Sequence, residues 1–196
     1  MIQDVTPDRS GARVEMLRGG DRVLIRPIHP HDIEMERKFI EGLSVKSRRF
    51  RFLESMPSPS DALLRQLTMI DPAIDVAYVA VIDDESQDHE VGVGRLSAQL
   101  DGSDCEFAIA VTDAWQKKGL GTLLMRCLIS DARQRGIARM HSSDASDNHL
   151  MRSFAAHLNL DHRLDPDDTT QVLYSVELTP SSEAPRSLNA EVQPRA

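Results

Sequence analysis

The segment QKKGLGT at residues 116–122 has the residue types and spacing of an anion-binding turn. It follows a strand-like stretch at residues 105–112 and precedes a stripe of apolar residues. An α-helix leaves its first N–H groups without intrahelical partners and carries partial positive charge at that end. The two glycines allow close approach of the backbone, so a pyrophosphate is the expected ligand. The residues of this turn are Gln116, Lys117, Lys118, Gly119, Leu120, Gly121 and Thr122.

The residues after the turn predict an amphipathic helix that Gly136 ends. Its apolar residues are Leu120, Leu123, Leu124, Cys127 and Leu128. Neither common nucleotide-binding pattern fits, because the segment lacks G-x-x-x-x-G-K-[ST] and lacks G-x-G-x-x-G followed by an acidic residue about 20 positions later. The pattern Q-x-x-G-x-G is therefore a third kind of phosphate turn.

This pattern, with the strand EFAIAV at residues 106–111 before it and Asn148 after the next strand, resembles the GNAT acetyltransferase superfamily. The resemblance covers roughly residues 22–178. Four further segments resemble the acetyltransferase domain of bacterial protein lysine acetyltransferases of the Pat type. They are IRPI at 25–28, LSVKSR at 43–48 with RF at 51–52, AYVAV at 77–81 and GRLS at 94–97.

The alternation of patterns predicts one α/β domain over residues 21–179, between a flexible N-terminal arm at 1–20 and a disordered tail at 180–196. The resemblance implies a mixed, mostly antiparallel sheet with splayed central parallel strands and helices on both faces. We expect strands at 22–28, 76–82, 90–99, 104–112, 137–143 and 171–178, and helices at 31–43, 44–52, 60–69, after the turn and at 147–158.

The resemblance implies that acetyl-CoA is the cosubstrate and that no metal is needed. In GNAT proteins this ligand enters where two parallel strands splay apart, here residues 104–112 and 137–143. The backbone of Ile109, Ala110 and Val111 would then bind the pantetheine amides.

Residues 116–122 would hold the pyrophosphate of the same ligand. Asn148 occupies the position of the asparagine that contacts the cofactor in the family. Asparagine is also among the best helix N-caps, so both roles of Asn148 stay open. Seven residues later, where many GNAT enzymes have a tyrosine that protonates the departing thiolate, this chain has Ala155.

Acetylation of a lysine requires a base. A lysine side chain has a pKa of about 10.4, so removing its proton near pH 7 costs roughly 4 to 5 kcal/mol. Glu106 lies where Pat-type domains carry their catalytic glutamate, and we expect it to be partly buried among Phe107, Ala108 and Leu96. Without the resemblance, an ion pair with Arg95 is the alternative interpretation.

Composition excludes several other functions. The chain has 196 residues and a formal net charge of -8, which opposes nonspecific binding to nucleic acid. Cys105 and Cys127 have no metal-site spacing. No apolar run approaches the roughly 18 residues of a membrane span, and the N-terminus lacks a signal-sequence pattern. We therefore expect a cytoplasmic protein without a membrane or nucleic-acid partner.

The resemblance implies an N-acetyltransferase that moves an acetyl group from acetyl-CoA to a primary amine by direct attack, with Glu106 as base. The Pat-like segments favour a protein lysine as acceptor, such as one on an acyl-CoA synthetase. A basic cluster of Lys46, Arg48, Arg49 and Arg51 either docks that protein or is a solvated helix face. A small amine or amino acid is the alternative acceptor, and an acyl-CoA sensor without turnover is a third interpretation. A homodimer stays open.

Overall fold

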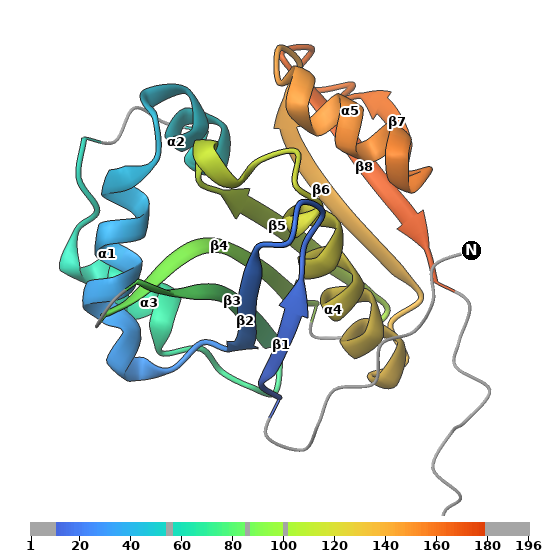
Figure 1. The fold of residues 1–196 in the computed structure, drawn as a ribbon. Helices are drawn as coiled ribbons and strands as arrows, with labels where there is room; N and C mark the ends of the chain where they lie inside the picture. Colours follow the sequence, from blue (N-terminus) through green and yellow to red (C-terminus); the bar gives the residue numbers. More distant parts are fainter. Residues whose placement is uncertain (1–10, 54–56, 85–86, 100–101, 179–196) are drawn as a thin grey trace, which may run out of the picture.

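The computed structural model describes residues 11–53, 57–84, 87–99 and 102–178. Within them, eight strands form one sheet in the order β1-β2-β3-β4-β5-β6-β8-β7 (Figure 1). The strands are β1 (Arg13–Met16), β2 (Arg22–Pro27), β3 (Asp75–Asp84), β4 (Gln87–Ala98), β5 (Asp104–Val111), β6 (Arg139–Ala145), β7 (Asp161–Leu164) and β8 (Gln171–Glu177). The helices are η1 (Pro30–Asp32), α1 (Ile33–Gly42), α2 (Val45–Phe52), α3 (Asp61–Thr68), η2 (Asp113–Trp115), α4 (Leu120–Gln134) and α5 (His149–Leu158).

The sheet is antiparallel except between its central strands β5 and β6. These two strands pair in parallel at three positions only, and the last pair is Glu106 with His141. Beyond it β5 stays paired with β4, and β6 stays paired with β8. The two central strands therefore splay apart toward their carboxyl ends, as the predicted fold class requires.

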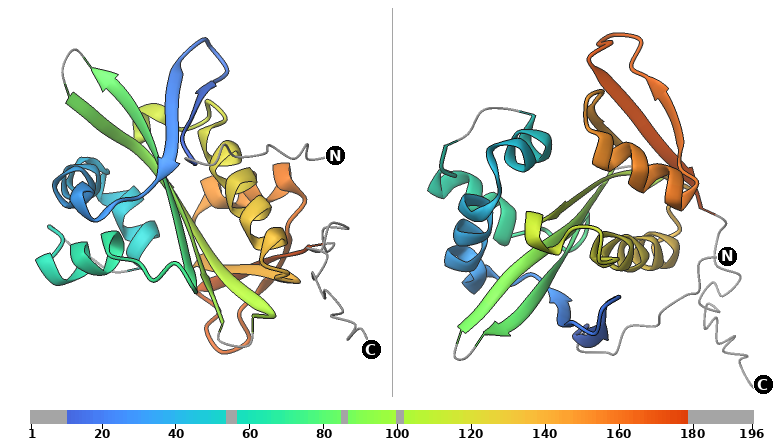
Figure 2. Two further views of the ribbon diagram at one scale, coloured as in Figure 1. Left: turned by 90° about the horizontal axis from the view of Figure 1, so that it is seen from below. Right: turned by 45° about the horizontal axis from the view of Figure 1, so that its top comes forward.

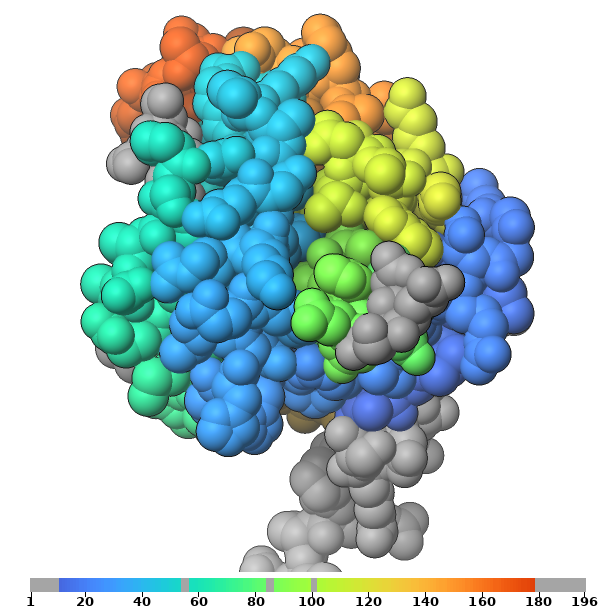
Figure 3. Space-filling model, turned by 60° about the vertical axis from the view of Figure 1, so that its left-hand side comes forward, coloured from blue at the N-terminus to red at the C-terminus, as the bar shows by residue number. Residues whose placement is uncertain are grey.

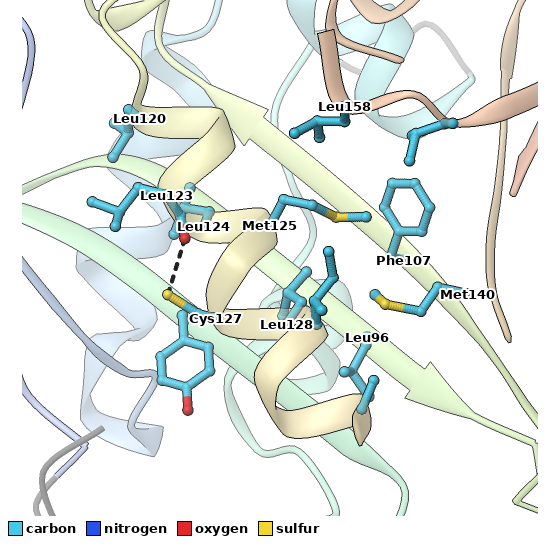
Figure 4. Close-up of a cluster of buried hydrophobic side chains, with 14 of the residues drawn as sticks. Leu96, Phe107, Leu120, Leu123, Leu124, Met125, Cys127, Leu128, Met140 and Leu158 are labelled. Carbon is cyan, nitrogen blue, oxygen red and sulfur yellow. Dashed lines mark hydrogen bonds between the residues drawn. The ribbon is translucent and has the colours of Figure 1, made fainter. Parts of the chain in front are cut away.

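Helix α4 packs on one face of the sheet through its apolar stripe. Leu120, Leu124 and Leu128 are fully buried there (Figure 4), and each such side chain contributes roughly 1.5–3 kcal/mol of transfer free energy. Two glycines of β4 permit this close contact, because a Cβ atom at Gly92 or Gly94 would lie 3.1 Å from a leucine side-chain atom of α4. This packing fixes the start of α4 beside the end of β5.

Helices α1 and α3 cover the opposite face, so the sheet is a layer between two groups of helices (Figure 2). Phe39 and Ile40 of α1 and Leu64 of α3 pack against β3 and β4. Serines cap two of the helices on this side: Ser44 and Ser60 accept hydrogen bonds from backbone N–H groups in the first turns of α2 and α3.

Two strands were not predicted. β1 lies in the segment expected to be a flexible arm, yet its four residues pair with β2. β7 pairs with β8 at the other edge of the sheet. The loop expected at 83–89 is also shorter, because β3 extends to Asp84 and β4 begins at Gln87. Residues 1–10 and 179–196, which contain half of the expected arm and the whole expected tail, lie outside the described residues.

An ionic cluster is buried between α1 and the sheet. Glu36 and Glu90 are 1% and 6% exposed. Arg95 contacts Glu36 at 3.0 Å and donates a hydrogen bond to the Leu67 carbonyl. Burial raises the pKa of Glu90 well above its ordinary value, the nearby Glu36 raises it further, and Arg95 opposes both effects. The folded protein therefore holds a proton here that the unfolded chain releases more readily.

This cluster predicts a pH-dependent stability. A raised folded-state pKa stabilises fully below the unfolded pKa of about 4.3, and the contribution is lost as pH rises through the folded value. In that window the free energy of unfolding should fall by up to about 1.4 kcal/mol per pH unit. Glu90→Gln cannot lose a proton, so its denaturant-unfolding curves should show a flatter pH dependence. An unchanged slope would contradict the assignment of the proton to Glu90.

Candidate active site

A cavity of about 730 Å³ lies at the splay of β5 and β6. It is lined by residues of α2, the end of β5, the turn before α4, the first half of α4, the β6–α5 region and the β1–β2 hairpin. The cavity brings together all but two of the predicted cofactor and catalytic residues. The exceptions are Leu120, which is buried in the core, and Glu106.

The end of β5 presents unpaired backbone to this cavity. Ile109, Ala110 and Val111 pair with β4 on one side, and no β6 residue pairs with them on the other. Gln116 donates a hydrogen bond from Nε2 to the Val111 carbonyl at 3.1 Å. The side chain of Gln116 thus braces the strand, and only its backbone is left for a phosphate.

The turn before α4 has the open helix start that its sequence predicts. Gly119 is the N-cap residue with φ of 94°, and no side chain caps the helix. Lys117 also has a positive φ, 61°, which is uncommon for a residue with a Cβ atom. A Cβ atom at Gly119 would meet nothing within 4 Å. No side chain occupies the first N–H groups of α4, and Gly119, Gly121 and Thr122 line the cavity, so an anion can bind at this helix start.

The two lysines of the turn differ in their partners. Lys118 forms an ion pair with Asp21 at 3.0 Å, and its Nζ lies 4.5 Å from the ring centroid of Trp115. Lys117 is exposed, and no described residue forms an ion pair with it. Of the two, Lys117 is free to meet a phosphate, and Trp115 packs against the core, as expected for a structural aromatic residue.

Helix α2 is tied to this turn by hydrogen bonds. Asp113 accepts from the Ser44 backbone and hydroxyl and from the Ser47 hydroxyl, at 3.0–3.1 Å. Gln116 lies 3.4 Å from the Ser47 hydroxyl. Figure 3 shows η2 and the turn (yellow) on the surface between α2 (cyan) and the β1–β2 hairpin (blue). Helix α2, which lines the cavity, is therefore positioned by Asp113 of η2 and Gln116 of the turn.

Asn148 is both an N-cap and a cavity residue. Its Oδ1 accepts a hydrogen bond from Met151 N, and its Nδ2 donates to Asp144 at 3.0 Å. Asn148 is 7% exposed and lines the cavity. Burial raises the pKa of Asp144, and the hydrogen bonds from Asn148 and the Ala145 backbone oppose that effect. Nδ2 contacts both carboxylate oxygens of Asp144, so the amide of Asn148 is fixed in orientation at the cavity wall.

The surroundings of Glu106 differ from those that the sequence predicts. It is exposed rather than partly buried among Phe107, Ala108 and Leu96. Side chains alternate along a strand, so Phe107 and its cross-strand neighbour Leu96 face α4, whereas Glu106 faces the side of α1 and α2. The Glu106 carboxylate has no hydrogen bond or ion pair with any described residue. It is open to solvent and to an incoming amine.

A positive charge lies near Glu106. Burial and the neighbouring Arg95 lower the pKa of Arg51 to about 10, and Glu36 and Glu106 act in the opposite direction. Arg51 also lines the cavity, so its positive charge acts both on the cavity and on Glu106. The alternative ion pair between Glu106 and Arg95 is not formed, because Arg95 contacts Glu36.

Ala155, at the position where many GNAT enzymes have a tyrosine, lies in the core. Ala155 is 2% exposed and packs within the main hydrophobic cluster. The neighbouring Phe154 lines the cavity and lies close to Gly121, where a Cβ atom would be 3.4 Å from its ring. No acid from this helix position reaches the site.

The members of the basic cluster of α2 differ in their partners and in their exposure. Arg48 donates hydrogen bonds to the carbonyls of Glu41, Leu43 and Pro57, so it joins α1 to α2. Lys46 and Arg49 are exposed and lie over the Phe50 ring. Arg49 also pairs with Asp147 across the mouth of the site. Lys46 and Arg49 are therefore the outward-facing members of this cluster.

Four charged residues of the cavity, Glu15, Arg18, Arg126 and Asp144, were missed from the sequence. Asp144 follows the strand that splays, and Arg126 lies one helical turn after Thr122, so their spacing from predicted residues was a usable signal. Arg18 belongs to the β1–β2 hairpin, which itself was not predicted. The hairpin brings a part of the chain from outside the GNAT-like pattern to the cavity.

Comparison with known proteins places this geometry in a family. The model of the acetyltransferase (GNAT) family matches residues 43–159. The chain is 41% identical to Acetyltransferase PA5475 of Pseudomonas aeruginosa over 165 residues, which cover 84% of this chain and 89% of that protein. It is 28% identical to Acetyltransferase Pat of Mycolicibacterium smegmatis over 69% of this chain and 40% of that protein.

A solved structure shares the fold. The GNAT domain of S. lividans PAT superposes with a TM-score of 0.77 at 23% identity, covering 85% of this chain and 97% of that one. The chain belongs to the GNAT acetyltransferase family. It is an N-acetyltransferase of the GNAT type, and enzymes of this family use acetyl-CoA as cosubstrate.

In the described part of the chain, no group of three or more His, Cys, Asp or Glu side chains is arranged to hold a metal ion. No helix there is both long and apolar enough to cross a membrane.

Proposed function

We propose that this protein transfers the acetyl group of acetyl-CoA to a primary amine by direct attack, with Glu106 as general base. The observation that carries the proposal is the position of Glu106 at the last paired residue of β5 and β6. Immediately beyond it, the free backbone edge of Ile109–Val111 and the open start of α4 line one cavity. The thioester and the general base would thus lie along β5, and the phosphates would lie just beyond it at the start of α4.

The residues divide the work as follows. Backbone groups of β5 from Ile109 to Val111 hold the pantetheine arm, and the side chain of Asn148 contacts it from the other side of the cavity. The N–H groups that start α4, with Lys117, hold the pyrophosphate. Acetyl-CoA supplies the activated thioester. Glu106 takes the proton of the attacking amine directly or through one water, and solvent protonates the leaving thiolate because Ala155 offers no acid.

A protein lysine is the acceptor we favour. Lys46 and Arg49 project from α2, the helix that forms one wall of the site, in a chain of net charge -8. The similarity to Acetyltransferase Pat supports an acceptor protein such as an acyl-CoA synthetase, although this chain spans 40% of that relative. A lysine within an acidic surface would be attracted by Lys46, and its acidic neighbours would compete with Asp147 for Arg49.

A small cationic amine is the second candidate, and a specific observation favours it. A cavity of about 420 Å³ adjoins the site and is lined by Arg49, Asp147 and Asp168 among others. Carboxylates there suit an amine with more than one positive charge. Free Arg49 would repel such a ligand, but in the structure its charge is paired with Asp147.

Salt dependence separates the two acceptors. Exposed charge contacts weaken with salt, since the screening length is about 8 Å at physiological ionic strength. The KM for a protein acceptor should therefore rise several-fold between low and physiological salt. Lys46→Ala with Arg49→Ala should flatten that rise and leave acetyl-CoA affinity unchanged. Arg48 is unsuitable for this test because it joins α1 to α2.

Acetyl incorporation into a protein mixture and into spermidine, measured in one buffer, decides between the candidates. Labelled protein with little spermidine turnover supports a protein acceptor. Robust spermidine turnover with unlabelled protein would overturn it. Binding of acetyl-CoA without turnover on any amine would instead favour the acyl-CoA sensor.

The remaining assignments follow from this function. We propose that residues 21–179 are the catalytic domain, extended on its N-terminal side by β1. A cytoplasmic location is supported by the two buried free thiols, Cys105 and Cys127.

A further inference from the structure

Besides Arg51 of α2, three cations line the same cavity without an ion-pair partner. Arg18, Lys117 and Arg126 all border it, and none of their side chains forms an ion pair or hydrogen bond with a described residue. The Nε atom of Arg126 is buried and unsatisfied. In a chain with 31 acidic and 23 basic residues, unpaired cations gathered in one cavity indicate an anionic ligand.

The cations occupy two places along α4. Lys117 belongs to the turn, beside the open N–H groups. Arg126 lies four residues beyond Thr122, which is ~6 Å further along the helix axis, and Arg18 reaches the cavity from the hairpin. The N–H groups at the start of α4 and Lys117 already account for binding of the pyrophosphate. Arg18 and Arg126 are therefore available to bind a second anionic group.

The hairpin is held firmly in this place. Leu17, next to Arg18, is 7% exposed and belongs to the main core. Asp21 pairs with Lys118, and Arg13 of β1 contacts the Cys127 sulfur of α4 at 2.6 Å. Leu17 N donates to the Asp21 carbonyl and closes the turn. Arg18 is therefore presented by an ordered turn that is joined to α4 and to the phosphate-binding segment.

The carboxylates near these cations are already engaged. Glu15 lines the same part of the cavity and pairs with Arg13 at 3.0 Å. Asp21 is held by Lys118. The charge that faces an entering ligand is thus positive.

We infer that Arg18 and Arg126 form a subsite for the ribose 3′-phosphate of coenzyme A. This inference rests on the proposed function. A phosphate monoester carries between one and two negative charges at neutral pH and offers three acceptor oxygens, which suit two guanidinium groups. Coenzyme A carries such a group beyond its pyrophosphate, and 3′-dephospho-coenzyme A lacks it. The hairpin, outside the residues 43–159 that the family model matches, would thereby select the full coenzyme.

Calorimetric titration of the full chain with coenzyme A and with its 3′-dephospho form tests the subsite. The wild type should bind coenzyme A about tenfold or more tightly than the dephospho form. Arg18→Ala and Arg126→Ala should each weaken coenzyme A binding several-fold and leave dephospho-coenzyme A binding unchanged. The double variant should bring the ratio of the two affinities close to one.

Control variants distinguish loss of the proposed subsite from a general loss of charge or of stability. Arg163→Ala removes an exposed arginine of β7 outside the cavity and should preserve the ratio. Arg126→Lys keeps a positive charge and should recover part of the preference if Arg126→Ala proves unstable. An unchanged ratio in the double variant, or an equal loss of affinity for both ligands, would overturn the subsite alone. Failure of the wild type to bind either ligand would overturn the proposed function together with it.

Discussion

Glu106→Gln should lower the turnover number by about 10²- to 10⁴-fold, the usual contribution of general-base catalysis. The affinity for acetyl-CoA should stay nearly unchanged, because the Glu106 side chain is exposed on the α1 and α2 side of the sheet and does not line the cavity. Steady-state kinetics with the preferred amine, beside calorimetry with acetyl-CoA, measures both quantities.

The pH profile makes this result specific. A glutamine cannot accept a proton, but an amine that is already neutral at high pH needs no base. The rate of Glu106→Gln should therefore continue to rise with pH toward the pKa of the acceptor amine. Asp104→Asn is the matched control, since it changes a carboxylate two residues earlier on β5 that pairs with Arg139. Loss confined to acetyl-CoA affinity, or equal loss in the control, would refute the role of Glu106.

Gly121→Glu should reduce the affinity for acetyl-CoA by roughly 100-fold or more. The added carboxylate opposes the pyrophosphate charge and competes for the N–H groups at the start of α4, and each charge-assisted hydrogen bond lost there is worth about 1.5–3 kcal/mol. The fold should tolerate the change, because a Cβ atom at Gly121 lies 3.4 Å from the Phe154 ring and 3.9 Å from Ile109. An acidic residue also suits a helix N-terminus.

A short series isolates the charge from the size of the new side chain. Gly121→Ala should bind nearly normally, whereas Gly121→Gln and Gly121→Glu should weaken binding in that order. Gly42→Glu is the control, since it lies at the end of α1 with nothing within 4 Å of a new Cβ atom. Unchanged affinity in a folded Gly121→Glu variant would remove the pyrophosphate from this turn.

The elements with strong local patterns were predictable from the sequence. The start of α4 follows from two glycines before a regular apolar stripe, and its buried face is the one that the spacing predicts. The N-cap role of Asn148 follows from its place before α5. These features depend on neighbouring residues, which the sequence displays directly.

The two missed strands have physical reasons. In β1 the apolar Val14 and Met16 are 58% and 64% exposed, while Arg13 and Glu15 lie on the more buried side. This reverses the alternation by which a strand is recognised. All four residues of β7 are exposed, so this edge strand has no apolar face to detect. Both strands depend on pairing with β2 and β8 rather than on their own composition.

The expected burial of Glu106 was wrong for a different reason. The alternation of Phe107, Ile109 and Val111 already assigns Glu106 to the opposite face of β5, so Phe107 could not shield it. The partner of Arg95 is Glu36, almost 60 positions earlier in the chain. Such long-range pairs depend on how α1 packs on the sheet, and no local spacing reveals them.

The most direct test of the account compares thiol release with amide formation in one reaction of the wild-type protein, acetyl-CoA and an amine acceptor. Direct transfer predicts that thiol appears only when the acceptor is present, with one acetylated amine formed for each thiol released. It also predicts that both fall together in Glu106→Gln. Thiol release that continues without acceptor, or an acetyl group retained on the protein while thiol accumulates, would contradict direct attack on an amine at the splay of β5 and β6.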